Sequence, residues 1–126
     1  MNKAIATIFV VISAFQVHAQ ESIEGTVPVI GVEAAVDYWV GINDCNTTPT
    51  ETNLSDTNTG DNSTVTVFEY TGGTDGAKVK FYRVNGGGHT WPGDASALRP
   101  SMLFGATNND IKAGQEIWNF FNEFEL

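Results

Sequence analysis

The sequence predicts a small α/β protein, because two of its stretches have the apolar spacing of amphipathic helices and two others alternate like β-strands. At 126 residues the chain holds one domain at most. Its formal net charge of −9 and its isoelectric point near 4.3 argue against nucleic acid or an anionic membrane surface as a partner.

The first 19 residues have the composition of a secretory signal peptide. Lys3 supplies a short positive region, Ala4–Phe15 is apolar, and Val17 and Ala19 are small residues at the −3 and −1 positions of a cleavage site. The apolar run is too short to span a membrane, which takes roughly 20 residues. We therefore predict a secreted or periplasmic chain of residues 20–126 without a membrane span. The alternative is a buried N-terminal strand, since Ile8–Ile12 is rich in β-branched and aromatic residues.

After this segment, the first predicted element is a helix over Val32–Ile42, whose apolar residues fall on one face. These residues are Val32, Ala35, Val36, Trp39 and Val40. Asp44–Ser63 is polar throughout and is predicted to be a loop. Within it Asp56–Asp61 has a weak likeness to a calcium loop, but Gly60 stands at a ligand position and Val67 replaces the bidentate glutamate. No metal and no other cofactor is predicted.

Two strands and a helix are predicted in the second half of the chain. Thr64–Tyr70 and Lys78–Val84 alternate between apolar and polar residues, and Thr71–Ala77 between them has the glycines of a hairpin turn. Thr107–Phe124 is predicted to be a helix that begins with a capping box and buries its aromatic residues. The apolar stripe of this predicted helix consists of Ile111, Gly114, Ile117, Trp118, Phe121 and Phe124.

The strongest functional signal is the stretch Val84–Gly93. Gly86–Gly88 precede His89, and Thr90–Gly93, which reads Thr-Trp-Pro-Gly, follows it. Three glycines give up side-chain packing, so either another segment approaches this backbone closely or the backbone needs unusual dihedral angles. The pattern predicts an imidazole on a shaped loop after a strand, where enzymes often hold a general base. From the residues alone, a glycine-rich hairpin with a locally hydrogen-bonded histidine is an equal alternative.

Gly86–Gly93 resembles the catalytic-histidine loop of the secreted polyhydroxybutyrate depolymerase and feruloyl esterase family, which belongs to the α/β-hydrolase superfamily. Glu24–Pro28 is similar to the acid loop of that family, and Asn109–Ile111 with Ile117–Phe121 is similar to its closing helix. The resemblance implies that residues 20–126 form a partial α/β-hydrolase fold. This part would contain a helix, a hairpin, the histidine loop and a helix, but neither the central parallel strands nor the nucleophile elbow.

The resemblance further implies His89 as the general base and Glu24, in place of the family's aspartate, as the acid that orients it during serine-dependent hydrolysis of polyester or feruloyl-type esters. An exposed Glu24 without a catalytic partner is the alternative. The sequence contains no Gly-x-Ser-x-Gly, and neither Ser96 nor Ser101 has such a frame. Because loss of the nucleophile in a well-studied serine protease costs about 10^6 in turnover, the chain by itself is predicted to be inactive.

Two strands and two helices leave apolar surface uncovered, so we predict marginal stability, a homo-oligomer or a partner that covers this surface. The second class of function is a small secreted, non-catalytic module in which Trp39 and Trp91 contact a polymer or a protein. Cys45 is the single cysteine, which leaves either an intermolecular bridge or burial as a small apolar residue. In the family that this chain resembles, the matching cysteine pairs with one in the next hairpin, where this chain has Thr71–Thr74.

Overall fold

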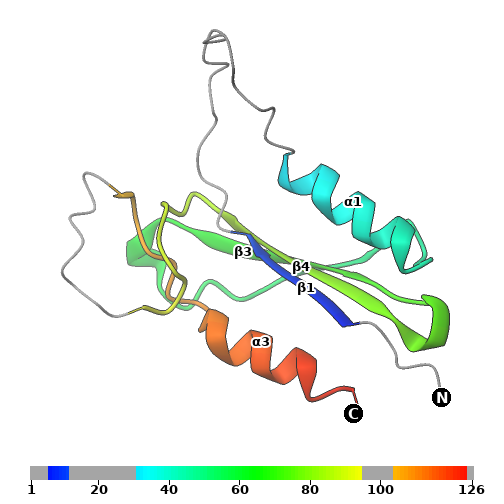
Figure 1. Cartoon of the computed structure of the whole chain (residues 1–126). Coiled ribbons are helices and arrows are strands. Elements are labelled where there is room, and N and C mark those ends of the chain that lie inside the picture. Colours follow the sequence, from blue (N-terminus) through cyan, green and yellow to red (C-terminus); the bar gives the residue numbers. More distant parts are fainter. Residues whose placement is uncertain (1–5, 12–30, 95–103, 125–126) are drawn as a thin grey trace, which may run out of the picture.

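The computed structural model describes residues 6–11, 31–94 and 104–124. Its helices and strands, in chain order, are β1 (Ala6–Val11), α1 (Val32–Ile42), β2 (Thr50–Asn53), β3 (Thr64–Tyr70), β4 (Lys78–Asn85) and α3 (Ala113–Phe121). Two single 3-10 turns, Thr59–Asp61 and Thr74–Gly76, stand before β3 and β4. Figure 1 shows α1 and α3 on opposite sides of one sheet, so the molecule has three layers.

The sheet has the strand order β1-β4-β3-β2. β2, β3 and β4 are antiparallel, while β1 pairs with β4 in parallel from Ala6 opposite Lys78 to Val11 opposite Arg83. The prediction of a partial α/β-hydrolase fold is therefore wrong, since three antiparallel strands with two helices are not the parallel-strand arrangement of that fold. The reason lies in the connections: the loops between β2, β3 and β4 are too short for a crossover and force neighbouring strands to run in opposite directions.

The helix predicted over Val32–Ile42 is confirmed as α1. Its residues Val36 and Val40 are buried against Val79 and Phe81 of β4 on one face of the sheet. Trp39 packs against the same cluster, so it belongs to the hydrophobic core under α1.

Cys45 lies directly after α1 and is buried in this cluster. Its thiol donates to the carbonyl of Ala77 at 3.6 Å, and a Cβ added at Gly73 would lie 2.8 Å from its sulfur. The hairpin segment that the family resemblance points to therefore does lie against Cys45. Burial, followed by the negative charge of Asp44, raises the pKa of the Cys45 thiol, which disfavours the nucleophilic thiolate.

The predicted hairpin is confirmed as β3 and β4, with β4 one residue longer than predicted. On the face opposite α1, four of its apolar side chains form a second buried cluster with Ile111, the residue two before α3. The four are Val65, Val67, Tyr82 and Val84.

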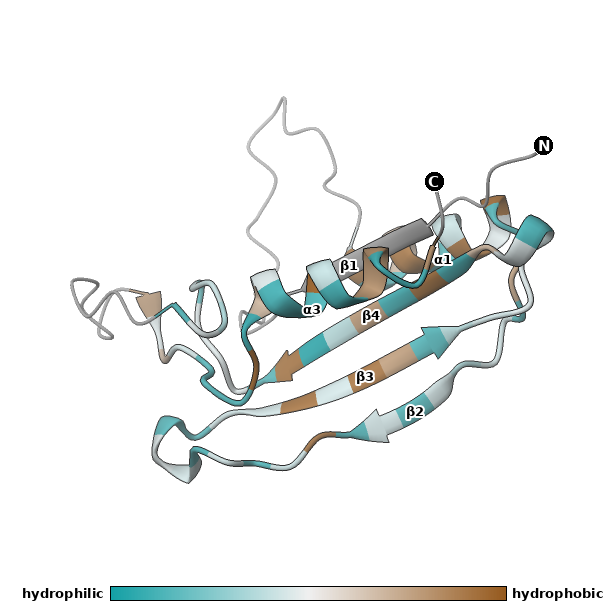
Figure 2. Ribbon diagram, turned by 90° about the horizontal axis from the view of Figure 1, so that it is seen from below, coloured by the Kyte–Doolittle hydropathy of each residue, from teal (hydrophilic) through white to brown (hydrophobic). Residues whose placement is uncertain are grey.

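The strand β2 was not predicted, because Asp44–Ser63 was interpreted as a loop throughout. All four residues of β2 are exposed and none is apolar, so the stretch lacks the alternation that marks a strand in sequence. Figure 2 shows β2 as the outer strand, without the brown hydrophobic bands of β3 and β4. Backbone pairing with β3, from Thr50 opposite Glu69 to Asn53 opposite Thr66, is what makes it a strand.

The C-terminal helix begins at Ala113 and not at Thr107 as predicted. Asn108 and Asp110 bond each other instead of capping a helix, since the Asp110 N–H donates to Asn108 Oδ1 at 3.2 Å. Such side-chain bonds compete with helical ones. The predicted buried stripe is also wrong, because Trp118 is 64 % exposed while Phe120 is 1 % exposed.

Several large apolar side chains are exposed in the described part of the chain. They are Tyr38, Ile42, Trp91, Phe104, Trp118 and Phe121. Among the helices of residues 31–94 and 104–124, none has both the length and the apolar character that crossing a membrane requires.

Candidate functional site in the His89 loop

His89 lies in the loop that follows β4, and this loop runs beside the segment before α3 (Figure 1, yellow and orange). Gly86 has a φ of 76°, which L-residues with a side chain rarely adopt. A Cβ at Gly88 would overlap the backbone of Phe104 and Gly105. The two requirements predicted for the glycine run, an unusual dihedral angle and a close approach, are thus met at Gly86 and Gly88.

Hydrogen bonds fix the backbone of the loop on both sides of His89. The Gly88 N–H donates to the carbonyl of Ala106, and the His89 N–H donates to the carbonyl of Phe104, each at 2.6 Å. The Thr90 hydroxyl donates to the Ala106 carbonyl at 3.2 Å. The imidazole is therefore carried on a held backbone, while the residue itself is exposed to solvent.

The predicted Pro-Gly turn closes the loop. The Asp94 N–H donates to the Trp91 carbonyl at 3.1 Å around Pro92 and Gly93, which lie in the turn. The Gly93 N–H then donates to the carbonyl of Asn108 at 2.8 Å, so the end of the loop is attached to the same segment as its beginning.

Asn108 belongs to a buried polar network, here called the polar staple, that consists of Asp61, Ser63, Asn108 and Asp110. Asp61 Oδ1 accepts from the Ser63 hydroxyl at 2.6 Å, and its Oδ2 accepts from the Asn109 N–H at 2.9 Å. Asn108 Nδ2 donates to Ser63 Oγ and to Asp110 Oδ2, each at 2.9 Å. The staple joins the loop before β3 to the segment on which the His89 loop lies.

Asp110 continues the staple toward the loop that contains Thr57. Its Oδ1 accepts from the N–H and the hydroxyl of Thr57 at 2.7 and 3.0 Å and from the Asn58 N–H at 3.1 Å. Burial by itself raises the pKa of Asp110, but the hydrogen bonds from Asn108, Thr57 and Asn58 outweigh it and hold that pKa below its usual value.

The staple's carboxylates are thus engaged by protein donors. In residues 31–94 and 104–124, no three His, Cys, Asp or Glu side chains are placed to bind a metal ion. Sequence analysis missed this network, because Asn108 and Ser63 are far apart along the chain and nothing local pairs them.

The structure brings His89 together with two aromatic residues. Trp91, two residues after His89, is 48 % exposed, and Phe104, whose backbone carbonyl accepts from the His89 N–H, is 37 % exposed. In the described ranges, no hydrogen bond joins the imidazole to another side chain. Glu24, Ser96 and Ser101 lie outside the described residues, so the pairing of His89 with Glu24 stays a prediction.

Comparisons with protein-family models, curated proteins and solved structures found no match to this chain. By its architecture it is a small protein with one mainly antiparallel sheet between two helices. Its best-defined functional feature is an exposed histidine on a loop held by backbone hydrogen bonds.

Proposed function

We propose that this chain is the histidine-bearing portion of a secreted serine carboxylic-ester hydrolase that acts on polyester or feruloyl-type esters, with His89 as its general base. The observation that carries the proposal is the exposed imidazole on a backbone fixed at Gly88, His89 and Thr90. A general base has to reach the proton that it removes, and rigid support keeps it within that reach. The resemblance of Gly86–Gly93 to a catalytic-histidine loop supports the same role.

The proposed reaction is acyl transfer through a serine. The imidazole takes the proton of the serine hydroxyl as its oxygen attacks the ester carbonyl, and then returns the proton to the departing alcohol. Water repeats both steps on the acyl-enzyme and releases the acid. Glu24 would accept a hydrogen bond from the other imidazole nitrogen and so orient the ring. The exposed Trp91, two residues from His89, and the exposed Phe104, whose carbonyl accepts from the His89 N–H, would offer apolar surface to the organic part of the ester.

The serine and its oxyanion hole have to come from outside these 126 residues, because the sequence has no nucleophile motif. The first test is hydrolysis of p-nitrophenyl butyrate by the purified chain, beside a His89→Ala variant. Glu51→Ala, on an exposed residue of β2 outside the loop, provides the control. We expect the same background rate from all three proteins. Activity that disappears in His89→Ala alone would reveal a nucleophile within this chain. It would overturn the proposal that the chain is only the histidine-bearing portion of a hydrolase.

The second test looks for the missing serine. The tagged chain is purified from the secreted fraction of its own host and treated with a fluorophosphonate, which labels activated serines. We expect a labelled co-purifying protein with the unchanged chain and with Glu51→Ala, but no label with His89→Ala. Absence of His89-dependent labelling in every fraction would contradict the hydrolase proposal.

A non-catalytic binding module is the second candidate, and the exposure of Trp91 and Phe104 favours it. Trp39 cannot share their surface, because it packs in the core under α1. The two candidates differ in what His89→Ala does. A binding module keeps its affinity for polyhydroxybutyrate granules in that variant and loses the affinity in Trp91→Ala.

A further inference from the structure

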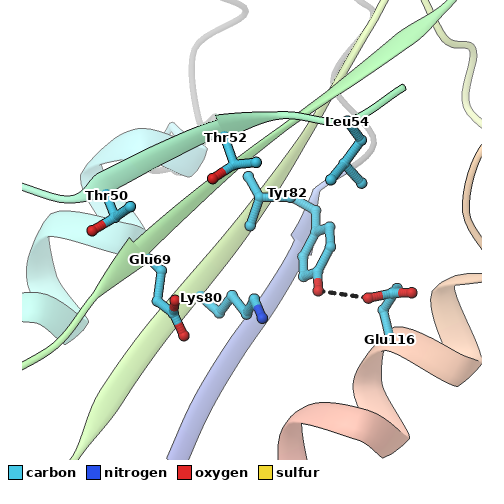
Figure 3. Close-up of a pocket in the computed structure, with 8 residues that line it drawn as sticks. Thr50, Thr52, Leu54, Glu69, Lys80, Tyr82 and Glu116 are labelled. Atoms are coloured by element: carbon cyan, nitrogen blue, oxygen red, sulfur yellow. Dashed lines mark hydrogen bonds between the residues drawn. The ribbon is translucent and has the colours of Figure 1, made fainter. Parts of the chain in front are cut away.

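A concave site separate from the His89 loop lies between α3 and the three antiparallel strands (Figure 3). Its volume is about 210 Å³ and it is open to solvent. Two apolar side chains, Leu54 and Val67, contribute to its wall. The polar groups around it are the hydroxyls of Thr50 and Thr52, the carboxylates of Glu69 and Glu116, the ammonium group of Lys80 and the phenol of Tyr82.

The strand register explains why these groups gather on one face. Residues that lie opposite one another on paired strands point to the same side of the sheet, and so do residues two positions apart. The register aligns Thr50, Glu69 and Lys80 in one row across β2, β3 and β4, and Thr52, Val67 and Tyr82 in the next. Most of the cavity wall is therefore built into the pairing of the strands, and Leu54 and Glu116 complete it from outside the sheet.

Glu116 closes the site from α3 and is held in place. The Tyr82 hydroxyl donates to Glu116 Oε2 at 2.8 Å (Figure 3). Burial, followed by this hydrogen bond to a carboxylate, raises the pKa of Tyr82 far above its usual value, so the phenol stays a donor. The other oxygen of Glu116 has no hydrogen-bond donor among the described residues.

The charges in the cavity do not neutralise one another. The Lys80 ammonium lies 5.9 Å from the centre of the Tyr82 ring. Within the described ranges, no carboxylate oxygen comes within the 4.0 Å of an ion pair with Lys80, although Glu69 stands opposite it on β3. A cavity that presents an ammonium group and two carboxylates side by side complements a ligand with charges of both signs.

We propose that this cavity binds a small zwitterion with an ammonium group at one end and a carboxylate at the other, of the free amino acid class. The ligand's ammonium is received by the oxygen of Glu116 that Tyr82 leaves open, and its carboxylate by Lys80, which lies between Glu116 and Glu69 (Figure 3). A purely cationic ligand would leave Lys80 without a counter-charge, and a purely anionic one would face two carboxylates. The site is independent of the hydrolase proposal.

The volume bounds the size of the ligand. About 210 Å³ corresponds to roughly seven water molecules at about 30 Å³ each. This holds a chain of a few carbons with its two end groups. It is smaller than the roughly 300–1,000 Å³ of sites for drug-sized ligands.

The ligand test uses three probes with the same four-carbon chain: γ-aminobutyrate with both charges, butylamine with the positive one and butyrate with the negative one. Binding to the full chain is followed by amide chemical shifts of β2, β4 and α3 in nuclear magnetic resonance titrations. We expect γ-aminobutyrate to bind at least about tenfold more tightly than either analogue, a difference of about 1.4 kcal/mol. Equal affinities, or no saturable shift at millimolar concentrations, would overturn the proposal.

Two substitutions then separate the charges. Lys80→Met is expected to remove the preference for γ-aminobutyrate over butylamine, and Glu116→Gln to remove the preference over butyrate. The matched controls are Lys112→Met, on an exposed residue outside the cavity, and Glu51→Gln, whose partner Phe68 packs on the opposite face. Unchanged preferences in Lys80→Met and Glu116→Gln would contradict the proposed roles. The comparison of the three probes uses the unchanged chain, so it tests the proposal even if a substituted chain does not fold.

Discussion

Asp110 joins the segment before α3 to the loop that contains Thr57 and Asn58. A single carboxylate accepts hydrogen bonds from Thr57, Asn58 and Asn108, and these bonds hold its pKa below the usual value. An aspartate in the unfolded chain has a pKa of about 3.9. Because the pKa is lower in the folded chain, Asp110 contributes stability that is present above that pH and is lost as the pH falls through the folded value.

We therefore predict that Asp110→Asn lowers the free energy of unfolding at pH 7 by about 1–3 kcal/mol, the range for hydrogen bonds to charged groups. The difference from the unchanged chain begins to shrink below about pH 4, where the aspartate of the unfolded chain takes up a proton, and it is lost as the pH falls through the lower pKa of the folded chain. Urea unfolding at pH 7, 5 and 3 measures both effects. Asp56→Asn, on an exposed aspartate next to Thr57, is the control. A difference that stays constant down to pH 3 would show that charge is not the cause.

The parts of the His89 loop that could be predicted from the sequence are those whose conformation is determined by neighbouring residues. A positive φ at Gly86 and the turn at Pro92–Gly93 follow from what these residue types allow, so the loop could be outlined from sequence. The contact of Gly88 with Gly105 and the bond of Ser63 to Asn108 join distant parts of the chain. No pattern of neighbouring residues carries that information.

At the scale of elements, α3 has a buried and an exposed aromatic residue two positions apart. Phe120 is 1 % exposed and Trp118 is 64 % exposed. We predict that Phe120→Ala lowers the free energy of unfolding by about 3–5 kcal/mol, while Trp118→Ala changes it by about 0.5 kcal/mol or less. Chemical denaturation followed by circular dichroism compares the two variants with the unchanged chain.

A reversed order of the two variants would show that the Trp118 side of α3 is the covered one in solution. Sedimentation velocity at several protein concentrations then distinguishes a second copy from a monomer with a different helix orientation. The predicted homo-oligomer is tested by the same measurement on the unchanged chain.

Two elements, α1 and β3, were predicted with correct bounds, because the spacing of their apolar residues runs through the whole element. α1 and β3 show a full apolar pattern, and each is also packed on that pattern. β2 has no apolar residue, and the start of α3 is set by hydrogen bonds of Asn108 and Asp110 to other segments. Both depend on partners outside the element, which a local pattern does not describe.

At the scale of the whole molecule, the predicted fold class was wrong because the relative direction of two strands depends on which strands pair, and the pattern within one strand does not determine its partner. The sequence contains a helix, a hairpin, a histidine loop and a helix in the expected order, but the hairpin with β2 makes the sheet mainly antiparallel. The N-terminal segment adds the only parallel pair of the described sheet. The alternative of an N-terminal strand, placed at Ile8–Ile12 from the sequence, corresponds to β1 at Ala6–Val11 in the structure.

We predict that a chain beginning at Gln20 is less stable than the full chain by at least about 3 kcal/mol. The six paired positions of β1 and β4 carry backbone hydrogen bonds worth about 0.5–1.5 kcal/mol each. Equilibrium unfolding of both chains in guanidinium chloride gives the difference in free energy. Equal midpoints and equal denaturant dependence would show that β1 does not contribute to the folded state in solution.

Because β1 pairs with β4, the sheet can be completed only after β4 has been synthesised. Each residue of β1 is translated about 70 residues before its partner on β4. At about 5–20 residues per second, the segment waits for roughly 4–14 seconds with its backbone unpaired. The same segment has the composition of a signal peptide, so an export receptor would meet it before β4 exists. Under the predicted export, recognition of this segment and its pairing with β4 would exclude each other, because both use the same residues.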